Sequence, residues 1–165
     1  MCFDGSCTKT SASTGVWLHN IETNHAEGNS YKLNFQCTNN IAEYEALLLG
    51  LHLLRKLGAK RIVVHGDSEL IIRQLKREYT AKHPRLRAYR DDTLDLLKTF
   101  DEYELTFVPR NQNMLANALA ISASNNRRPC ENKQHIIQEK YRPVVPNNQR
   151  YWQVFEGDKQ IEEFL

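Results

Sequence analysis

The residues best suited to chemistry in this sequence are three acids, Asp4, Glu43 and Asp67, which stand in largely apolar surroundings. Asp4 interrupts a short apolar segment, Glu43 lies near the start of a long helical segment, and Asp67 closely follows a buried strand. A mixed sheet can bring two strand positions and one helix start to a single point. Clustered carboxylates repel one another unless a cation lies among them, and Mg²⁺ binds through carboxylates, water and phosphate oxygens. The pattern therefore indicates phosphoryl chemistry assisted by two metal ions.

Each acid also has a structural explanation. Asn40 and Glu43 have the spacing of a capping box at a helix start, and Asp67 is placed to cap the helix that follows it. Glu45 competes with Glu43, because the two differ by about 200° around a helix and only one of them can face a shared site. From spacing alone, these alternatives stay open.

The distribution of charge indicates a phosphate-bearing partner. The chain has 22 Lys and Arg against 20 Asp and Glu, which gives a net charge of +2. Between residues 73 and 90 one acid, Glu78, stands against seven basic residues: Arg73, Lys76, Arg77, Lys82, Arg85, Arg87 and Arg90. Such a patch attracts nucleic acid, and beside an acidic cluster it favours a nuclease. The alternative is a solvated helix face.

Length and composition exclude several classes of protein. With 165 residues, 41% of them hydrophobic, the chain is long enough for one domain with its own core. No apolar run reaches the roughly 18 residues of a membrane span, and the N-terminus lacks the pattern of a secretion signal. We therefore expect an intracellular protein, cytoplasmic or nuclear, with no membrane partner. The four cysteines form no C-x-x-C pair, which argues against zinc.

The periodicity of apolar residues predicts an α/β domain over residues 1–126. Residues 27–29 are predicted to form the turn between the second and third strands. Three consecutive strands followed by alternating helices and strands favour a mixed sheet, with strands one to three antiparallel and helices on its faces. Residues 127–165 hold three of the five prolines and are predicted to be a linker-like tail, partly ordered at most. Strands are expected at 1–4, 15–18, 31–37, 61–65 and 104–108, and helices at 41–57, 68–77, 86–100 and 113–124.

Four motifs resemble the type 1 ribonuclease H family in order and spacing. They are Phe3-Asp4-Gly5-Ser6, the segment 38–47, Gly66-Asp67-Ser68, and Val108-Pro109-Arg110 followed by 113–120. The resemblance covers residues 1 to about 125 and is greatest to the ribonuclease H domains of plant gypsy-class retrotransposon polyproteins. It implies a ribonuclease H-like fold with a five-stranded mixed sheet, and hydrolysis of the RNA strand of RNA/DNA hybrids. Reverse transcriptase and integrase portions of the same polyprotein would be partners.

The resemblance also implies roles for individual residues. Asp4 would bridge two Mg²⁺ or Mn²⁺ ions. Glu43, in preference to Glu45, would complete the metal site with Asp67 on the leaving-group side. Contacts to 2′-hydroxyl groups would distinguish RNA from DNA. Together with the basic stretch, the predicted nucleic-acid contacts are Gly5, Ser6, Thr38, Asn39, Asn40, Arg85, Arg87 and Asn113.

The last motif departs from the family pattern at Asn117, where the family carries an aspartate. An amide keeps the shape and one oxygen acceptor but loses the negative charge. Because the resemblance implies that this position helps to hold the ion that activates the attacking water, we expect catalysis to be impaired. One alternative function is a catalytically silent domain of a retroelement-derived protein that binds RNA/DNA hybrid or other nucleic acid. Another is a structural spacer within a polyprotein.

Overall fold

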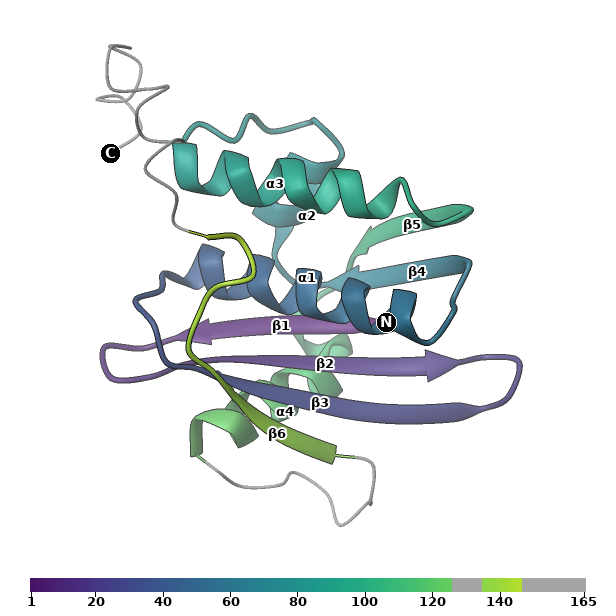
Figure 1. Ribbon diagram of the computed structural model, residues 1–165, viewed down its shortest axis with the longest axis horizontal. Coiled ribbons are helices and arrows are strands. Elements are labelled where there is room, and N and C mark those ends of the chain that lie inside the picture. The colour runs from purple at the N-terminus through teal and green to yellow at the C-terminus, as the bar shows by residue number, and fades with distance from the viewer. Residues whose placement is uncertain (126–134, 147–165) are drawn as a thin grey trace.

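Six strands form one mixed β-sheet that organises the molecule (Figure 1). The computed structural model describes residues 1–125 and 135–146. The strands are β1 (Cys2–Cys7), β2 (Ala12–Asn20), β3 (His25–Leu33), β4 (Arg61–Gly66), β5 (Glu102–Phe107) and β6 (His135–Lys140). Their order in the sheet is β5-β4-β1-β2-β3-β6. The first three pair antiparallel as predicted, whereas β4 is parallel to β1, β5 to β4, and β6 to β3.

Helices cover both faces of this sheet. One face carries α1 (Asn39–Lys56), α2 (Glu69–Leu75) and α3 (Pro84–Leu97). The other face carries α4 (Met114–Asn125), which follows the short 3-10 helix η1 (Arg110–Gln112); Figure 1 shows α4 behind the sheet and α1 in front of it. The main core lies under the first group of helices and includes Phe3, Tyr44, Leu47, Val64, Ile71, Tyr89 and Leu105. Among the described helices, none is both long enough and apolar enough to cross a membrane.

Two glycines let helices approach the sheet on either side of Asp4. A Cβ atom on Gly5 would lie 2.3 Å from the backbone nitrogen of Glu43 in α1. On the opposite face, a Cβ atom on Gly15, the strand partner of Asp4, would lie 2.1 Å from the carbonyl oxygen of Ala116 in α4. A larger side chain at either position would push a helix away from the sheet. The glycines therefore bring α1 and α4 close to the middle of β1.

The turn predicted at residues 27–29 is wrong, because these residues lie inside β3. Gly28 pairs with Trp17, and a Cβ atom there would lie 2.8 Å from Leu119 Cδ2 of α4. This glycine therefore accommodates a helix and does not reverse the chain. The reversal comes earlier, at Asn24, whose φ of 58° lies in the left-handed region that asparagine tolerates.

The sixth strand was not expected, since five strands and a linker-like tail were predicted. β6 extends the sheet beyond β3, from the pair Gly28–His135 to the pair Leu33–Lys140. The ladder continues with a 2.7 Å hydrogen bond from Asn34 N to the carbonyl oxygen of Lys140. A strand added at a sheet edge is held by main-chain hydrogen bonds, which every residue type except proline can form, so the sequence pattern does not predict it. The rest of the predicted tail, residues 127–134 and 147–165, lies outside the described residues.

A buried arginine holds the chain that follows β6 against α3. Arg85 is 7% exposed and donates through Nη1 to the carbonyl oxygen of Pro146 at 2.8 Å, and through Nη2 to that of Val145 at 2.5 Å. Its guanidinium lies over the ring of Tyr89, 4.8 Å from the ring centre. Val145 is itself fully buried in the main core. The phosphate contact predicted for Arg85 does not fit this arrangement, because the guanidinium is buried and its donors are engaged.

Glu45 in α1 holds the same segment from the other side. This glutamate is fully buried, and its Oε1 accepts hydrogen bonds from the Tyr89 hydroxyl at 2.5 Å and from Val144 N at 2.8 Å. Burial raises the pKa of Glu45, and the two hydrogen bonds partly oppose that rise. Helices α1 and α3 and residues 144–146 therefore share one buried polar network.

We expect Arg85→Ala to lower the free energy of unfolding by about 2–3 kcal/mol, because two main-chain carbonyl groups would lose their donors. Lys98→Ala removes an exposed cation just after the end of the same helix and serves as the control. It should change the free energy of unfolding by less than about 0.5 kcal/mol. Urea denaturation followed by circular dichroism measures both values, and equal stabilities of the two variants would contradict the buried network.

Candidate metal centre

Three carboxylates converge where β1 and β4 lie side by side. Asp4 lies on β1, Glu43 on α1, and Asp67 directly after β4. Because β4 runs parallel to β1 with Gly66 opposite Phe3, Asp67 comes to lie beside Asp4. One oxygen of each carboxylate lies within 4.8 Å of the others. The structure thus brings together the three acids that were predicted to share a site.

Helix capping does not account for Glu43 or Asp67. α1 is capped by Thr38, whose Oγ1 accepts a hydrogen bond from Ile41 N at 3.2 Å, so Glu43 lies in the second turn, beyond the cap. α2 is capped by Ser68, the residue after Asp67. The structural explanations considered for these two acids are therefore wrong.

Glu45 is excluded from the site by its direction. It lies two residues after Glu43 on α1, and its carboxylate contacts Tyr89 and Val144 instead. The rotation of about 200° between the two positions sends the two side chains into different surroundings. Of the two glutamates, Glu43 is the one that faces Asp4.

Each of the three carboxylates has one buried oxygen that no described residue satisfies with a hydrogen bond. Asp4 and Glu43 are 1% and 8% exposed, and the side chain of Asp67 is 7% exposed. Asp4 Oδ1, Glu43 Oε2 and Asp67 Oδ2 are all buried without a hydrogen-bond partner among the described residues. Burying such groups unpaired is costly, so buried polar atoms without partners call for an explanation. A cation among them provides one.

The electrostatics of the cluster favour a bound proton when no cation is present. Burial, followed by the nearby Asp4 and Asp67 carboxylates, raises the pKa of Glu43 from 4.5 to about 10. The pKa of Asp67 is raised first by burial and then by Asp4, and the Asn113 amide and Arg110 guanidinium partly offset the rise. Arg110 Nε lies 3.8 Å from Asp67 Oδ2, but the arginine side chain is 79% exposed and neutralises little. Glu43 therefore holds a proton near neutral pH.

Asn117, in the first turn of α4, adds an amide to the cluster. Its Nδ2 donates a hydrogen bond to Asp4 Oδ2 at 2.8 Å. Because a carboxylate accepts but does not donate, the amide nitrogen, and not its oxygen, faces Asp4. Asn117 therefore adds a hydrogen-bond donor, and no further negative charge, to the three carboxylates. In this orientation Asn117 presents no lone pair beside Asp4.

Asn113 supports the site from the interior. It is 1% exposed, and its Nδ2 donates to the carbonyl oxygen of Phe3 at 2.8 Å, which ties the start of α4 to β1 next to Asp4. The nucleic-acid contact predicted for Asn113 does not fit this burial. The sequence assigns no role to Arg110, whose Nε lies 3.8 Å from Asp67 Oδ2. Its place directly after Pro109 in the last motif was the available signal.

The other predicted nucleic-acid contacts lie mainly at the start of α1 and the end of β1. Asn39 Oδ1 accepts a hydrogen bond from Cys7 N at 2.9 Å, which joins these two elements. Arg87, in α3, is half-buried, and its Nε donates to the carbonyl oxygen of Ala81 at 3.2 Å. At the junction of α1 and β1, the exposed residues are Thr38 and Asn39, the half-buried ones are Ser6 and Asn40, and the buried one is Gly5.

The donor set fits a hard divalent cation. Mg²⁺ and Mn²⁺ prefer oxygen ligands, and Mg²⁺ is usually bound through one or two carboxylates together with water and substrate phosphate. Here three separate elements each supply a carboxylate oxygen that lacks a hydrogen-bond partner within the described part of the chain. The arrangement can therefore concentrate divalent cations and phosphate oxygens at one place on the sheet.

The chain is similar in sequence to known proteins over much of its length. The sequence profile of the reverse transcriptase-like family matches residues 2–123. Ribonuclease HI of Halobacterium salinarum is 40% identical over 88 residues, which cover 53% of this chain and 44% of that protein. The bifunctional protein Rv2228c of Mycobacterium tuberculosis is 35% identical over 108 residues, which cover 66% of this chain and 29% of that protein. The chain thus spans less than half the length of these two relatives.

Solved structures share the fold. The crystal structure of RNase H1 from Halobacterium salinarum matches with a TM-score of 0.68 and 32% identity, over 76% of this chain and 96% of that one. The structure of LC11-RNase H1 in complex with RNA/DNA hybrid matches with a TM-score of 0.66 and 28% identity, over 76% of this chain and 95% of that one. The predicted ribonuclease H-like α/β fold is confirmed, with one strand more than expected.

Without a divalent cation, the protein should lose stability as the pH rises. The pKa of Glu43 is raised to about 10 in the folded chain, against 4.5 for a free glutamate side chain. The stability linked to its proton is therefore complete below about pH 4.5 and is lost as the pH rises toward 10. Asp67 acts in the same direction. We expect the free energy of unfolding in EDTA to fall by at least about 2 kcal/mol between pH 6 and pH 9.

Glu43→Gln should make this pH dependence much smaller, since an amide does not titrate. Glu102→Gln changes an exposed glutamate at the edge of the sheet and should leave the pH dependence as in the parent chain. Urea titrations over a series of pH values give the comparison. Parallel curves for the parent chain and Glu43→Gln would show that Glu43 is not the buried titrating group.

Proposed function

We propose that this chain, which belongs to the reverse transcriptase-like family, is a ribonuclease H-type hydrolase that cleaves the RNA strand of RNA/DNA hybrids. The observation that carries the proposal is the convergence of Asp4, Glu43 and Asp67, each with a buried oxygen that lacks a hydrogen-bond partner among the described residues. The similarity to ribonuclease HI and to an RNase H1 solved in complex with RNA/DNA hybrid supports this activity.

The acidic cluster is the proposed binding place of two Mg²⁺ or Mn²⁺ ions. Asp4 would contact both ions, Glu43 and Asp67 would contact the ion on the leaving-group side, and Asn117 would stand beside the other. Divalent ions bound there would supply charge neutralisation and an activated water for phosphodiester hydrolysis. The chain itself holds the carboxylates close together at low exposure, so that they act on one phosphate in a weakly screened environment.

The hybrid is proposed to approach across the start of α1 and the end of β1. Thr38 and Asn39 are exposed there, and Ser6 and Asn40 are partly exposed. Their hydroxyl and amide groups suit hydrogen bonds to phosphates and to the 2′-hydroxyl groups that distinguish RNA from DNA. Gly5 would contribute only its backbone, since α1 covers it.

The finer assignment is a retroelement polyprotein of the plant gypsy class, in which the chain would lie between reverse transcriptase and integrase portions. The order and spacing of the four motifs support it, and the match to the reverse transcriptase-like family supports only the link to a reverse transcriptase portion. The neighbouring polymerase would then supply the substrate, because copying RNA into DNA produces an RNA/DNA hybrid.

Asn117 favours one alternative function, a catalytically silent domain that binds hybrid. The amide leaves the cluster one negative charge short of the family pattern, and its hydrogen bond occupies Asp4 Oδ2. Weaker retention of the ion beside Asn117 would slow hydrolysis and leave the binding surface intact.

We expect the parent chain to cleave a labelled RNA/DNA hybrid slowly or not at all in Mg²⁺, and Asn117→Asp to raise the rate by about tenfold or more. The restored charge would strengthen metal binding beside Asp4. Asn20→Asp, an exposed change of the same type on β2, should leave the rate as in the parent chain, and EDTA should abolish cleavage by all three proteins.

Equal rates for the parent chain and Asn117→Asp would contradict the role given to this position. Binding of hybrid by both proteins with cleavage by neither would favour the silent domain over the hydrolase.

A further inference from the structure

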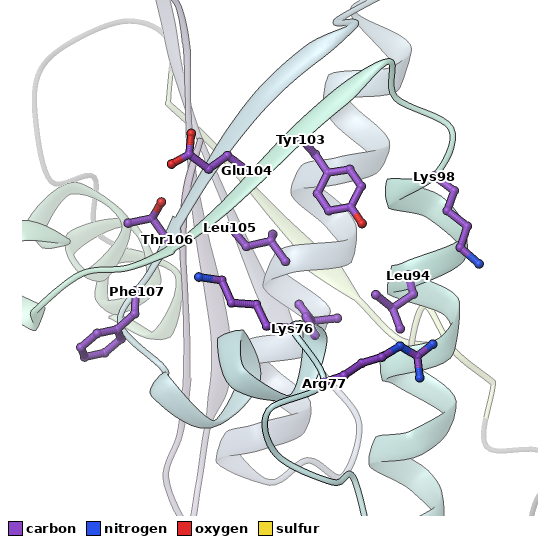
Figure 2. A pocket seen from close by; sticks show the side chains of 10 residues that line it. Lys76, Arg77, Leu94, Lys98, Tyr103, Glu104, Leu105, Thr106 and Phe107 are labelled. Atoms are coloured by element: carbon purple, nitrogen blue, oxygen red, sulfur yellow. The ribbon is translucent and has the colours of Figure 1, made fainter.

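A groove outside the acidic cluster lies between the ends of α2 and α3 and the strand β5. Its volume is about 880 Å³, and Figure 2 shows the side chains that line it. β5 is the last strand in the sheet order, so no further strand in the described part of the chain covers this edge. The groove is therefore accessible to a ligand that lies along the sheet edge.

Three exposed cations line this groove. Lys76 and Arg77 follow the end of α2, Lys98 follows the end of α3, and none of the three forms an ion pair with another described residue. Glu104 is the one acid among the lining residues, and Figure 2 shows its side chain on the opposite side of β5 from Leu105. The charge of the groove therefore suits phosphate groups.

The backbone at Arg77 is unusual for such a residue. Its φ of 61° lies in the left-handed region. Where a helix ends in this conformation, glycine or asparagine is usual, because other side chains are strained there. Arg77 N donates to the carbonyl oxygen of Gln74 at 3.1 Å and Glu78 N to that of Arg73 at 2.8 Å, so this conformation completes the end of α2 and places Arg77 at the groove wall.

Two aromatic rings add to the groove from the side of the sheet. Tyr103 and Phe107 are 43% and 44% exposed, whereas Leu105 between them is buried in the main core. Because side chains alternate along a strand, all three lie on the face of β5 that carries α2 and α3. Exposed rings beside cations are the pattern with which proteins stack unpaired bases and hold the phosphates between them.

One end of the groove lies on the strand next to the acidic cluster. Phe107 pairs with Gly66 of β4, the residue before Asp67, and Val108 N donates to the carbonyl oxygen of Gly66 at 2.9 Å. The Phe107 end of the groove is therefore one strand away from Asp67, and Tyr103 lies further along β5. A nucleic-acid strand that leaves the cluster past Asp67 would meet Phe107 first and Tyr103 next.

We infer that this groove binds the unpaired strand that continues from a hybrid held at the acidic cluster. Its phosphates lie against the three cations, and its bases stack on Tyr103 and Phe107. An unpaired strand is the fitting ligand because bases within a duplex are stacked on one another and do not offer their faces to side chains. The inference rests on the proposed function for the position of the hybrid.

Fluorescence anisotropy in EDTA, which prevents cleavage, tests the groove. The probes are a blunt RNA/DNA hybrid, the same hybrid with a ten-nucleotide extension at its 3′ or its 5′ end, and an oligothymidylate of twenty nucleotides. We expect an extension of one polarity to tighten binding to the parent chain by about tenfold. Tyr103→Ala should remove this gain without weakening the binding of the blunt hybrid, whereas Tyr103→Phe should keep it.

Charge is tested separately. Lys76→Ala combined with Lys98→Ala should reduce the salt dependence of binding to the extended hybrid by about 1 to 2 in the logarithmic slope. Lys56→Ala removes an exposed cation at the end of α1, outside the groove, and should leave that slope unchanged. An equal slope for the parent chain and the double variant would overturn the role of these cations.

Equal affinity of the parent chain for blunt and extended hybrids would overturn the groove assignment. Failure of the parent chain to bind the blunt hybrid would contradict the proposed function instead. In that case the oligothymidylate tests the groove assignment independently of the hybrid. Weaker binding of the oligothymidylate by Tyr103→Ala than by the parent chain would support the groove assignment, and identical titrations of the two proteins would overturn it.

Discussion

Mutual repulsion among three buried carboxylates is the constraint on which the rest of this structure depends. The sheet fixes Asp4 beside Asp67, and α1 brings Glu43 against them because Gly5 leaves no side chain between helix and strand. The charge of the cluster is relieved either by protons, as the raised pKa of Glu43 indicates, or by a cation. A cation that binds at the cluster would therefore also stabilise the fold.

The two glutamates on α1 have different roles, since Glu43 belongs to the proposed cation site and Glu45 to a buried hydrogen-bond network. Glu43 faces the cluster with an oxygen that has no hydrogen-bond partner among the described residues, whereas Glu45 accepts hydrogen bonds from Tyr89 and Val144. The second set of contacts fixes the rotation of α1 about its axis, and that rotation keeps Glu43 directed at Asp4. The chain after β6 thus supports the site from a distance, through a network that never touches it.

The three acids were predictable because each is out of place in its own local pattern, such as Asp4 within an apolar strand. The structural role of Arg85 was not predictable. Its neighbours in the sequence are basic, and the carbonyl groups that it binds belong to residues 60 and 61 positions away. The sequence predicts a turn at Gly28 because a glycine needed for the close approach of a helix has the same sequence signature as one needed for a turn. Local patterns report local conformation, and they say little about partners supplied by distant segments.

The central claim, that Asp4, Glu43 and Asp67 together form one cation site, is tested most directly by titration with Mn²⁺, with the free ion followed by electron paramagnetic resonance. We expect saturable binding by the parent chain and binding at least about tenfold weaker after Asp4→Asn, which removes a ligand charge and retains the side-chain shape. Superimposable Mn²⁺ binding curves for the parent chain and Asp4→Asn would contradict the claim.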